Sequence, residues 1–135
     1  MYPECFYRVS CKALITNEHG HILLAKETNG KWELLGGGLD HHEEPHEGLA
    51  REVMEETGLT LHSIASSPSY FVTFQNTTYK FFRANLVFKA KVDSLDFTPS
   101  DECTQLAYFA IEDILDRDDV FCNVKKLAQQ ILDQA

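Results

Sequence analysis

The most constraining feature of this 135-residue chain is the segment Gly37–Leu59, GGLDHHEEPHEGLAREVMEETGL, which predicts a glycine loop followed directly by a helix. A short apolar strand, Trp32–Leu35, leads into the glycines at 36–38. Glycine lets the backbone adopt positive φ and approach a ligand closely, although three glycines in a simple turn would look the same. The triplet alone favours a simple turn between this strand and the helix that follows.

The helix is predicted from about Glu44 to Thr57. Pro45 stands near its start, where a missing N–H costs nothing. Gly58 follows its end, where a left-handed cap is common. An apolar face would dock this helix on a sheet, and its side chains are Leu49, Val53 and Met54, helped by Ala50.

The opposite face carries three carboxylates. Glu52, Glu55 and Glu56 occupy positions i, i+3 and i+4, which share one side of a helix, and like charges there repel one another. A hard divalent cation would remove that repulsion, because Mg2+ prefers oxygen ligands from carboxylates, water and phosphate. The alternative meaning of such a run is a solvated acidic face.

The segment resembles the Nudix box, G-x5-E-x7-R-E-U-x-E-E-x-G-U with U a bulky aliphatic residue, of a family that hydrolyses nucleoside diphosphates linked to another moiety. Every specified place is filled, by Gly37, Glu43, Arg51, Glu52, Val53, Glu55, Glu56, Gly58 and Leu59. The resemblance implies an α/β fold, the Nudix α/β/α sandwich, with a mixed β-sheet between helices. Many relatives carry Pro where this chain has Leu35 and Gly where it has His42, which alters loop stiffness more than chemistry.

The resemblance also implies a cofactor and residue roles. Mg2+, with Mn2+ as a substitute, would be held by Glu52, Glu56 and Glu55 and by a backbone carbonyl of Gly36 or Gly37. Glu43 would pair with Arg51, which would orient Glu52. Metal-activated water would attack a phosphorus of the diphosphate bridge. The catalytic set implied is Glu43, Arg51, Glu52, Glu55 and Glu102, with the general base either in the box or at Glu102.

Glu102 enters that set because it lies on a loop shortly before Tyr108-Phe109, where relatives often show a Trp-Phe pair after a loop glutamate; a surface acid is the alternative. MutT-type relatives place a phosphate-contacting basic residue near Lys26 and a purine-binding Asn near Asn123. Lys26 is otherwise a solvated strand end, and Asn123 an ordinary helix N-cap. Five further side chains are candidates for substrate stacking or for packing: Tyr7, Arg8, Phe74, Tyr79 and Phe81.

Length and charge bound the other possibilities. The chain is long enough for one Nudix domain over residues 1–135 with a proper core. A net charge of −9 argues against non-specific binding to nucleic acid or to an anionic membrane. We therefore expect a small nucleotide-type substrate as the partner, no membrane association, and a monomer or a homodimer. No apolar run is long enough to span a membrane, and no signal peptide is visible.

The cysteines and histidines indicate neither a disulfide framework nor a zinc site. Cys5, Cys11, Cys103 and Cys122 are widely scattered, so we interpret them as reduced thiols of a cytoplasmic protein. Three histidines, His41, His42 and His46, cluster beside the box without a cysteine near them, in a spacing that matches no standard zinc site. We expect exposed loop histidines.

Outside the box, the pattern predicts strands and a C-terminal helix. Hairpins are expected from strands 7–16 and 21–26 around a turn at Asn17–Gly20, and from strands 70–75 and 78–92 around Asn76-Thr77. Further strands are expected at 59–65 and 105–110, a loop at 97–103 and a short helix at 111–115. An amphipathic stripe from Val120 to Leu132 predicts a last helix that packs on the core rather than on a partner.

These features favour a metal-dependent hydrolase that cleaves the diphosphate linkage of a nucleoside diphosphate derivative or a nucleoside triphosphate. One alternative is a catalytically inactive Nudix-like sensor of a nucleotide ligand, which a decayed box would indicate. Another is a prenyl diphosphate isomerase-like enzyme, whose cysteine and glutamate motifs we cannot place. Substrate choice lies outside the box, and no marker of the ADP-ribose, coenzyme A or diadenosine polyphosphate subfamilies is visible.

Overall fold

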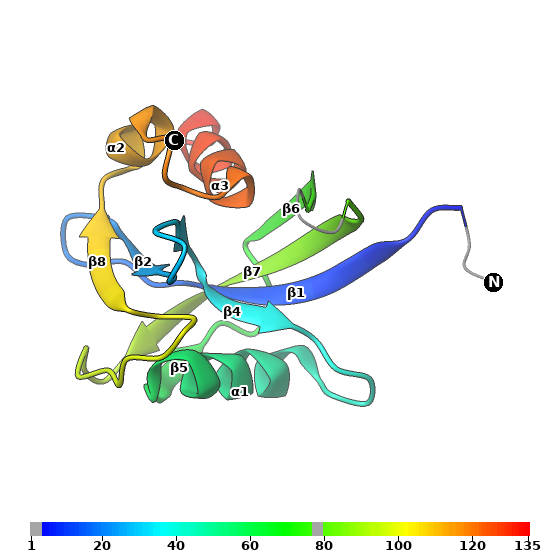
Figure 1. The fold of residues 1–135 in the computed structure, drawn as a ribbon, viewed down its shortest axis with the longest axis horizontal. Helices are drawn as coiled ribbons and strands as arrows, with labels where there is room; N and C mark the ends of the chain where they lie inside the picture. Colours follow the sequence, from blue (N-terminus) through cyan, green and yellow to red (C-terminus); the bar gives the residue numbers. More distant parts are fainter. Residues whose placement is uncertain (1–3, 77–79) are drawn as a thin grey trace.

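The computed structural model describes residues 4–76 and 80–135 and places eight strands and three helices among them (Figure 1). The strands are β1 Tyr7–Leu14, β2 Ile22–Lys26, β3 Trp32–Glu33, β4 Leu35–Gly38, β5 Leu61–Ile64, β6 Tyr70–Gln75, β7 Phe82–Val92 and β8 Gln105–Phe109. The helices are α1 Pro45–Thr57, α2 Ile111–Asp116 and α3 Cys122–Asp133. No helix in these residues is long and apolar enough to cross a membrane.

The strands form two sheets. The larger has the order β4-β1-β7-β5, and β6 also pairs with β7. Strands β1 and β7 are parallel, with Ser10 opposite Asn85 and Lys12 opposite Val87, whereas the other pairs are antiparallel. The smaller sheet has the order β3-β2-β8 and is antiparallel. The predicted mixed sheet is therefore confirmed.

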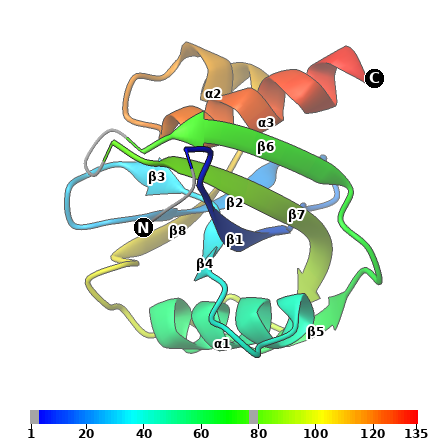
Figure 2. The same ribbon diagram turned by 90° about the vertical axis from the view of Figure 1, so that its right-hand side faces the viewer.

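Helices cover both sides of the strands, as the sandwich requires. In Figure 2, α1 lies below the sheets, and α2 and α3 lie above them. Alternate residues of the strands supply the two cores, because successive side chains point to opposite faces. On β2, Leu24 belongs to the cluster that contains Leu127 of α3, and Leu23 belongs to the cluster that contains Leu49 and Val53 of α1.

Helix α1 begins and ends as predicted, but its docking face is different. Pro45 is the first helical residue, and Gly58 closes the helix with φ 73°. Leu49 and Val53 are fully buried. Met54, however, is 47% exposed, and Ala50 is exposed as well, so their predicted part in docking is wrong. Buried Glu56 and Thr57 occupy the packed face instead, and with Glu56 a carboxylate turns toward the sheet.

Pairing in the sheets changes two local predictions and confirms a third. Strands β1 and β2 form a hairpin only at its tip, through the Thr16–Ile22 bridge, and then diverge into different sheets. The glycines at 36–38 belong to strand β4 instead of a loop. The second predicted hairpin is present as β6 and β7, although β7 begins at Phe82 and residues 77–79 of its turn lie outside the described residues.

Candidate functional site

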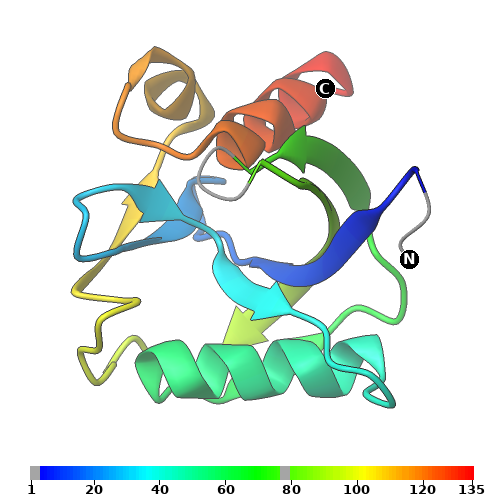
Figure 3. The same cartoon turned by 45° about the vertical axis from the view of Figure 1, so that its right-hand side comes forward.

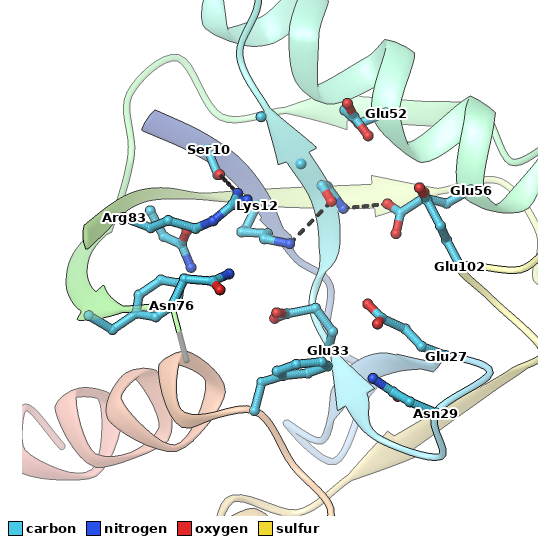
Figure 4. A pocket seen from close by; sticks show the side chains of 16 residues that line it. Ser10, Lys12, Glu27, Asn29, Glu33, Glu52, Glu56, Asn76, Arg83 and Glu102 are labelled. Atoms are coloured by element: carbon cyan, nitrogen blue, oxygen red, sulfur yellow. Dashed lines mark hydrogen bonds between the residues drawn. The ribbon is translucent and has the colours of Figure 1, made fainter. Parts of the chain in front are cut away.

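A cleft of about 490 Å³ opens where β4 passes over α1, within the size range of small-molecule sites. Figure 3 shows this strand running above the helix that follows it. In Figure 4, glutamates from several elements occupy one side of the cleft, and Arg83 and Asn76 occupy the other. The lining consists of Ser10, Lys12, Glu27, Asn29, Glu33, Gly36, Gly37, Gly38, Glu52, Glu56, Phe74, Asn76, Arg83, Asn85, Glu102 and Phe121.

Two glycines of β4 make the close approach to α1 possible. Gly36 has φ 127°, and a Cβ there would collide with the backbone carbonyl of Cys11. A Cβ on Gly37 would lie 2.5 Å from Oε2 of Glu52. Any side chain at Gly37 would therefore displace the Glu52 carboxylate from the cleft wall.

The Gly36 peptide groups face the cleft because of the strand register. The Leu39 N–H donates to the Val9 carbonyl of β1. Because the backbone groups of successive residues point to opposite sides of a strand, the N–H and C=O groups of odd-numbered residues in β4 point toward β1. Gly36 faces the other way. Its N–H donates to Oε1 of Glu56 at 2.7 Å, and its carbonyl accepts from Nζ of Lys12 at 3.1 Å (Figure 4).

Glu56 and Lys12 are buried ionisable groups that neighbour each other at the base of the cleft. Glu56 is 4% exposed and Lys12 is 8% exposed. Burial raises the pKa of Glu56 to about 8, against the lowering effect of Lys12 and of the Gly36 N–H, while Glu102 and Glu52 raise it further. Burial also raises the pKa of Glu52. The cleft thus gathers five glutamates, whose charge Lys12 and Arg83 only partly offset.

Arg51 joins the helix to the loop before it. Its Nε and Nη2 donate to the two carboxylate oxygens of Glu43 at 2.7 and 2.9 Å, and Nη1 donates to Glu52 at 3.1 Å. Further donation reaches Glu55 at 3.2 Å and the Gly38 carbonyl at 3.3 Å. The predicted contacts of Arg51 with Glu43 and Glu52 are present, and the Arg51 hydrogen bond lowers the pKa of Glu43 to about 2.

The donor chemistry of the cleft fits a hard divalent cation. Buried Glu56, half-buried Glu52 and the Gly36 carbonyl are oxygen donors, and Lys12 already supplies a positive charge to that carbonyl. Within residues 4–76 and 80–135, no three acidic, His or Cys side chains are gathered around one point. The reason is visible in the contacts: Arg51 holds Glu52 and Glu55, and the Gly36 N–H holds Glu56.

Several predicted residues lie outside the lining of the cleft. Glu55 is exposed and bound to Arg51, and Nζ of Lys26 lies 5.9 Å from the centroid of the Trp32 ring. Arg8 donates to the Leu39 carbonyl. Asn123 is not the N-cap of α3, which is Phe121; its amide nitrogen donates to Glu33 at 2.8 Å, so it holds a cleft carboxylate from behind.

The stacking candidates and the histidines also separate. Phe74 lines the cleft, but Phe81 lies beside Phe6, with ring centroids 6.3 Å apart, and Tyr7 lies beside Phe82. Tyr79 is outside the described residues. The three box histidines are exposed as expected, but His46 lies on α1 instead of a loop. His42 adopts φ 68°, the left-handed region that favours glycine. All four cysteines are free thiols.

Sequence reasoning missed most of the cleft floor, which β1 and β7 supply: Ser10, Lys12, Arg83 and Asn85. One signal was available. Lys12 interrupts the apolar run from Cys11 to Ile15, and a buried lysine is rare unless it is paired. Glu27 and Glu33 gave no such signal, since a glutamate at a turn or a strand end is ordinary.

Comparisons with known proteins agree with this geometry. A model of the NUDIX domain matches residues 6–129. A MutT-like protein of Streptomyces ambofaciens is 32% identical over 112 residues, covering 82% of this chain and 69% of that protein. An RNA pyrophosphohydrolase of Vibrio cholerae is 38% identical over 55 residues, covering 40% of this chain and only 32% of that protein.

Solved structures give the same result. The MutT protein from Methanosarcina mazei Go1 superposes with a TM-score of 0.79 at 28% identity, covering 98% of each chain. A MutT NUDIX hydrolase from Burkholderia pseudomallei superposes with a TM-score of 0.76 at 25% identity, covering 93% of this chain and 98% of the other.

Proposed function

The chain belongs to the NUDIX family of hydrolases, and from that premise we propose that it is a pyrophosphohydrolase that needs a divalent metal ion. Its substrate would be a nucleoside diphosphate derivative or a nucleoside triphosphate, cut at the diphosphate linkage. The observation that carries this proposal is the meeting of Gly36, Glu52 and Glu56 in one cleft, beside the buried ammonium of Lys12.

We place the metal ion, Mg2+ or its substitute Mn2+, on Glu52, Glu56 and the Gly36 carbonyl. Gly36 is favoured over Gly37 because its carbonyl points away from β1 and into the cleft. Glu55 is exposed beside Glu52 and would join the set only after release from Arg51. When bound, the metal ion would neutralise phosphate charge and acidify the attacking water.

The protein's own side chains divide the remaining work. Lys12 lines the cleft beside Gly36 and supplies positive charge that would hold phosphate oxygens in place. Arg51 and Glu43 fix the orientation of Glu52 through their paired hydrogen bonds. Glu102 lies on the 97–103 loop, lines the cleft and forms no salt bridge within the described residues. We therefore propose that it is the general base that accepts the proton of the attacking water.

The same proposal covers partners and compartment. The substrate would be a small nucleotide, and a non-specific nucleic-acid partner is disfavoured by the net charge of −9. The matched RNA pyrophosphohydrolases share only about a third of their length with this chain. We therefore do not propose RNA as a substrate of this chain. We propose the cytoplasm as the compartment, supported by four free cysteines, and a monomer or homodimer as the assembly, with the Nudix domain spanning residues 1–135.

The test is hydrolysis of a substrate panel with Mg2+ or with EDTA, using nucleoside triphosphates, nucleotide sugars, ADP-ribose, NADH and dinucleoside polyphosphates. We expect one class to be hydrolysed only with Mg2+. Glu52→Gln should lower kcat by at least about a hundredfold while the protein stays folded. The matched control is Glu112→Gln, an exposed glutamate on α2. Near-native turnover by folded Glu52→Gln would refute the assignment.

A further inference from the structure

Asn85 is a buried polar side chain whose amide has no partner. It lies on β7, is 1% exposed and lines the cleft. Neither its amide nitrogen nor its amide oxygen has a hydrogen-bond partner among the described residues. Buried amides are nearly always satisfied, and an unsatisfied one in a native protein calls for an explanation, such as a ligand that binds there.

The position itself does not require a polar residue. Val87, two residues further on the same face of β7, is fully buried in the apolar cluster beneath α3. Val72, opposite Asn85 on β6, belongs to the same cluster. An apolar side chain would extend this core to the cleft, and the free protein would gain stability from it, because an unpaired buried amide is unfavourable.

The amide and its surroundings fit the edge of a nucleobase. An asparagine amide offers one donor and one acceptor side by side, which matches a base that presents an adjacent acceptor and donor. Two aromatic residues, buried Phe74 and half-buried Phe121, also line the cleft and give it apolar walls against which a base can pack. Asparagine, a pair of rings and a polar cleft together indicate a planar heterocycle rather than a second phosphate.

The distance from the proposed metal ligands is also appropriate. Strand β7 is separated from β4 by β1 alone, with Gly38, Ser10 and Asn85 in one row across the sheet. Two strand spacings place Asn85 about 10 Å from the glycine strand. A nucleobase here and a diphosphate at Gly36 would be separated by the width of a ribose.

We propose that Asn85 is a specificity-determining residue that binds the donor–acceptor edge of the substrate's nucleobase on the floor between β1 and β6. The inference rests on the proposed nucleotide hydrolysis and adds the part of the nucleotide that sets substrate choice. Asn123, by contrast, does not line the cleft, and its amide nitrogen donates to Glu33.

The test compares wild type, Asn85→Leu and Asn29→Asp, a control on another wall of the cleft, with ATP, GTP, CTP, UTP and purine riboside triphosphate, which lacks exocyclic groups. For the preferred base we expect Asn85→Leu to raise KM by about tenfold or more and to change kcat little. Its preference over purine riboside triphosphate should disappear, while its melting temperature stays equal or rises. Asn29→Asp should keep the wild-type preference.

Two outcomes would overturn the inference: an unchanged base preference in folded Asn85→Leu, or a lower melting temperature with unchanged KM, which indicates a structural role. If Asn85→Leu does not fold, Asn85→Asp, which keeps the shape and loses the donor, replaces it under the same criteria. If wild type hydrolyses none of the five nucleotides, the proposed hydrolysis of nucleoside triphosphates fails separately. Calorimetric binding of the same nucleotides in EDTA then decides: a preference lost in the variant supports the role of Asn85, and equal binding refutes it.

Discussion

Replacing Glu56 by glutamine should make the metal-free protein more stable and abolish its use of metal. The Glu56 carboxyl is 4% exposed, and its pKa rises from 4.5 to about 8 in the folded protein, chiefly because of burial. Glutamine keeps an oxygen that can accept from the Gly36 N–H but carries no charge. The substitution therefore removes the cost of burying a carboxylate without removing the hydrogen bond that docks it.

The sign and size of this effect follow from proton linkage. Between pH 4.5 and about 8, the folded Glu56 carboxyl keeps a proton that the unfolded one has lost, so stability falls as pH rises through this window and levels off above it. The free energy of unfolding that wild type loses through Glu56 is of order 3 kcal/mol at pH 7 and below about 1 kcal/mol at pH 5. In a domain of this size, 3 kcal/mol corresponds to a melting temperature higher by on the order of 10 °C.

The assay is thermal and urea unfolding from pH 5 to 9 in EDTA, followed by circular dichroism. The free energy of unfolding of Glu56→Gln should exceed that of wild type most at pH 8–9 and approach it at pH 5. That of Glu112→Gln should follow wild type at every pH. Added Mg2+ should raise the stability of wild type, since it binds only the folded state, and should leave Glu56→Gln unchanged. A difference between Glu56→Gln and wild type that does not depend on pH would refute the reasoning.

Two further predictions concern the box loop and Arg51. His42→Gly should stabilise the protein by about 0.5–1 kcal/mol in urea unfolding, because φ at His42 is 68°, while His41→Gly should not; a destabilised His42→Gly protein would contradict this. Arg51→Lys cannot keep the paired hydrogen bonds to Glu43 and should lower kcat at least about tenfold. The Glu43 pKa of about 2 gives stability that is present above pH 4.5 and lost as pH falls toward 2, so acid unfolding of Arg51→Lys should begin at higher pH than in wild type. Identical acid transitions would count against the pairing.

The box helix was predictable because its signals are local. Pro45, Gly58 and the spacing of the glutamates fix its limits and its acidic side within a few turns of chain. Met54 shows where that reasoning fails. An apolar side chain near the docking face is exposed, and the carboxyl of Glu56 is buried, because the glycines of β4 bring the backbone, and with it a hydrogen-bond donor, to that side of the helix.

The cleft floor was not predictable for a different reason. Ser10 and Asn85 are 75 positions apart and meet only through the parallel pairing of β1 with β7. No local pattern specifies that one strand of a hairpin leaves its partner, as β1 leaves β2 to join β4 and β7. The residue that we propose for substrate choice depends on this pairing, whereas the proposed metal ligands are contained in one segment.

The central claim is that water attacks a phosphorus atom in this cleft with the help of a divalent cation. The most direct test is one turnover of the substrate that the panel identifies, in water enriched in oxygen-18, with Mg2+ or with EDTA and analysed by mass spectrometry. We predict one labelled oxygen in one phosphate product with Mg2+ and no turnover in EDTA. Products without label, or equal turnover in EDTA, would contradict the account.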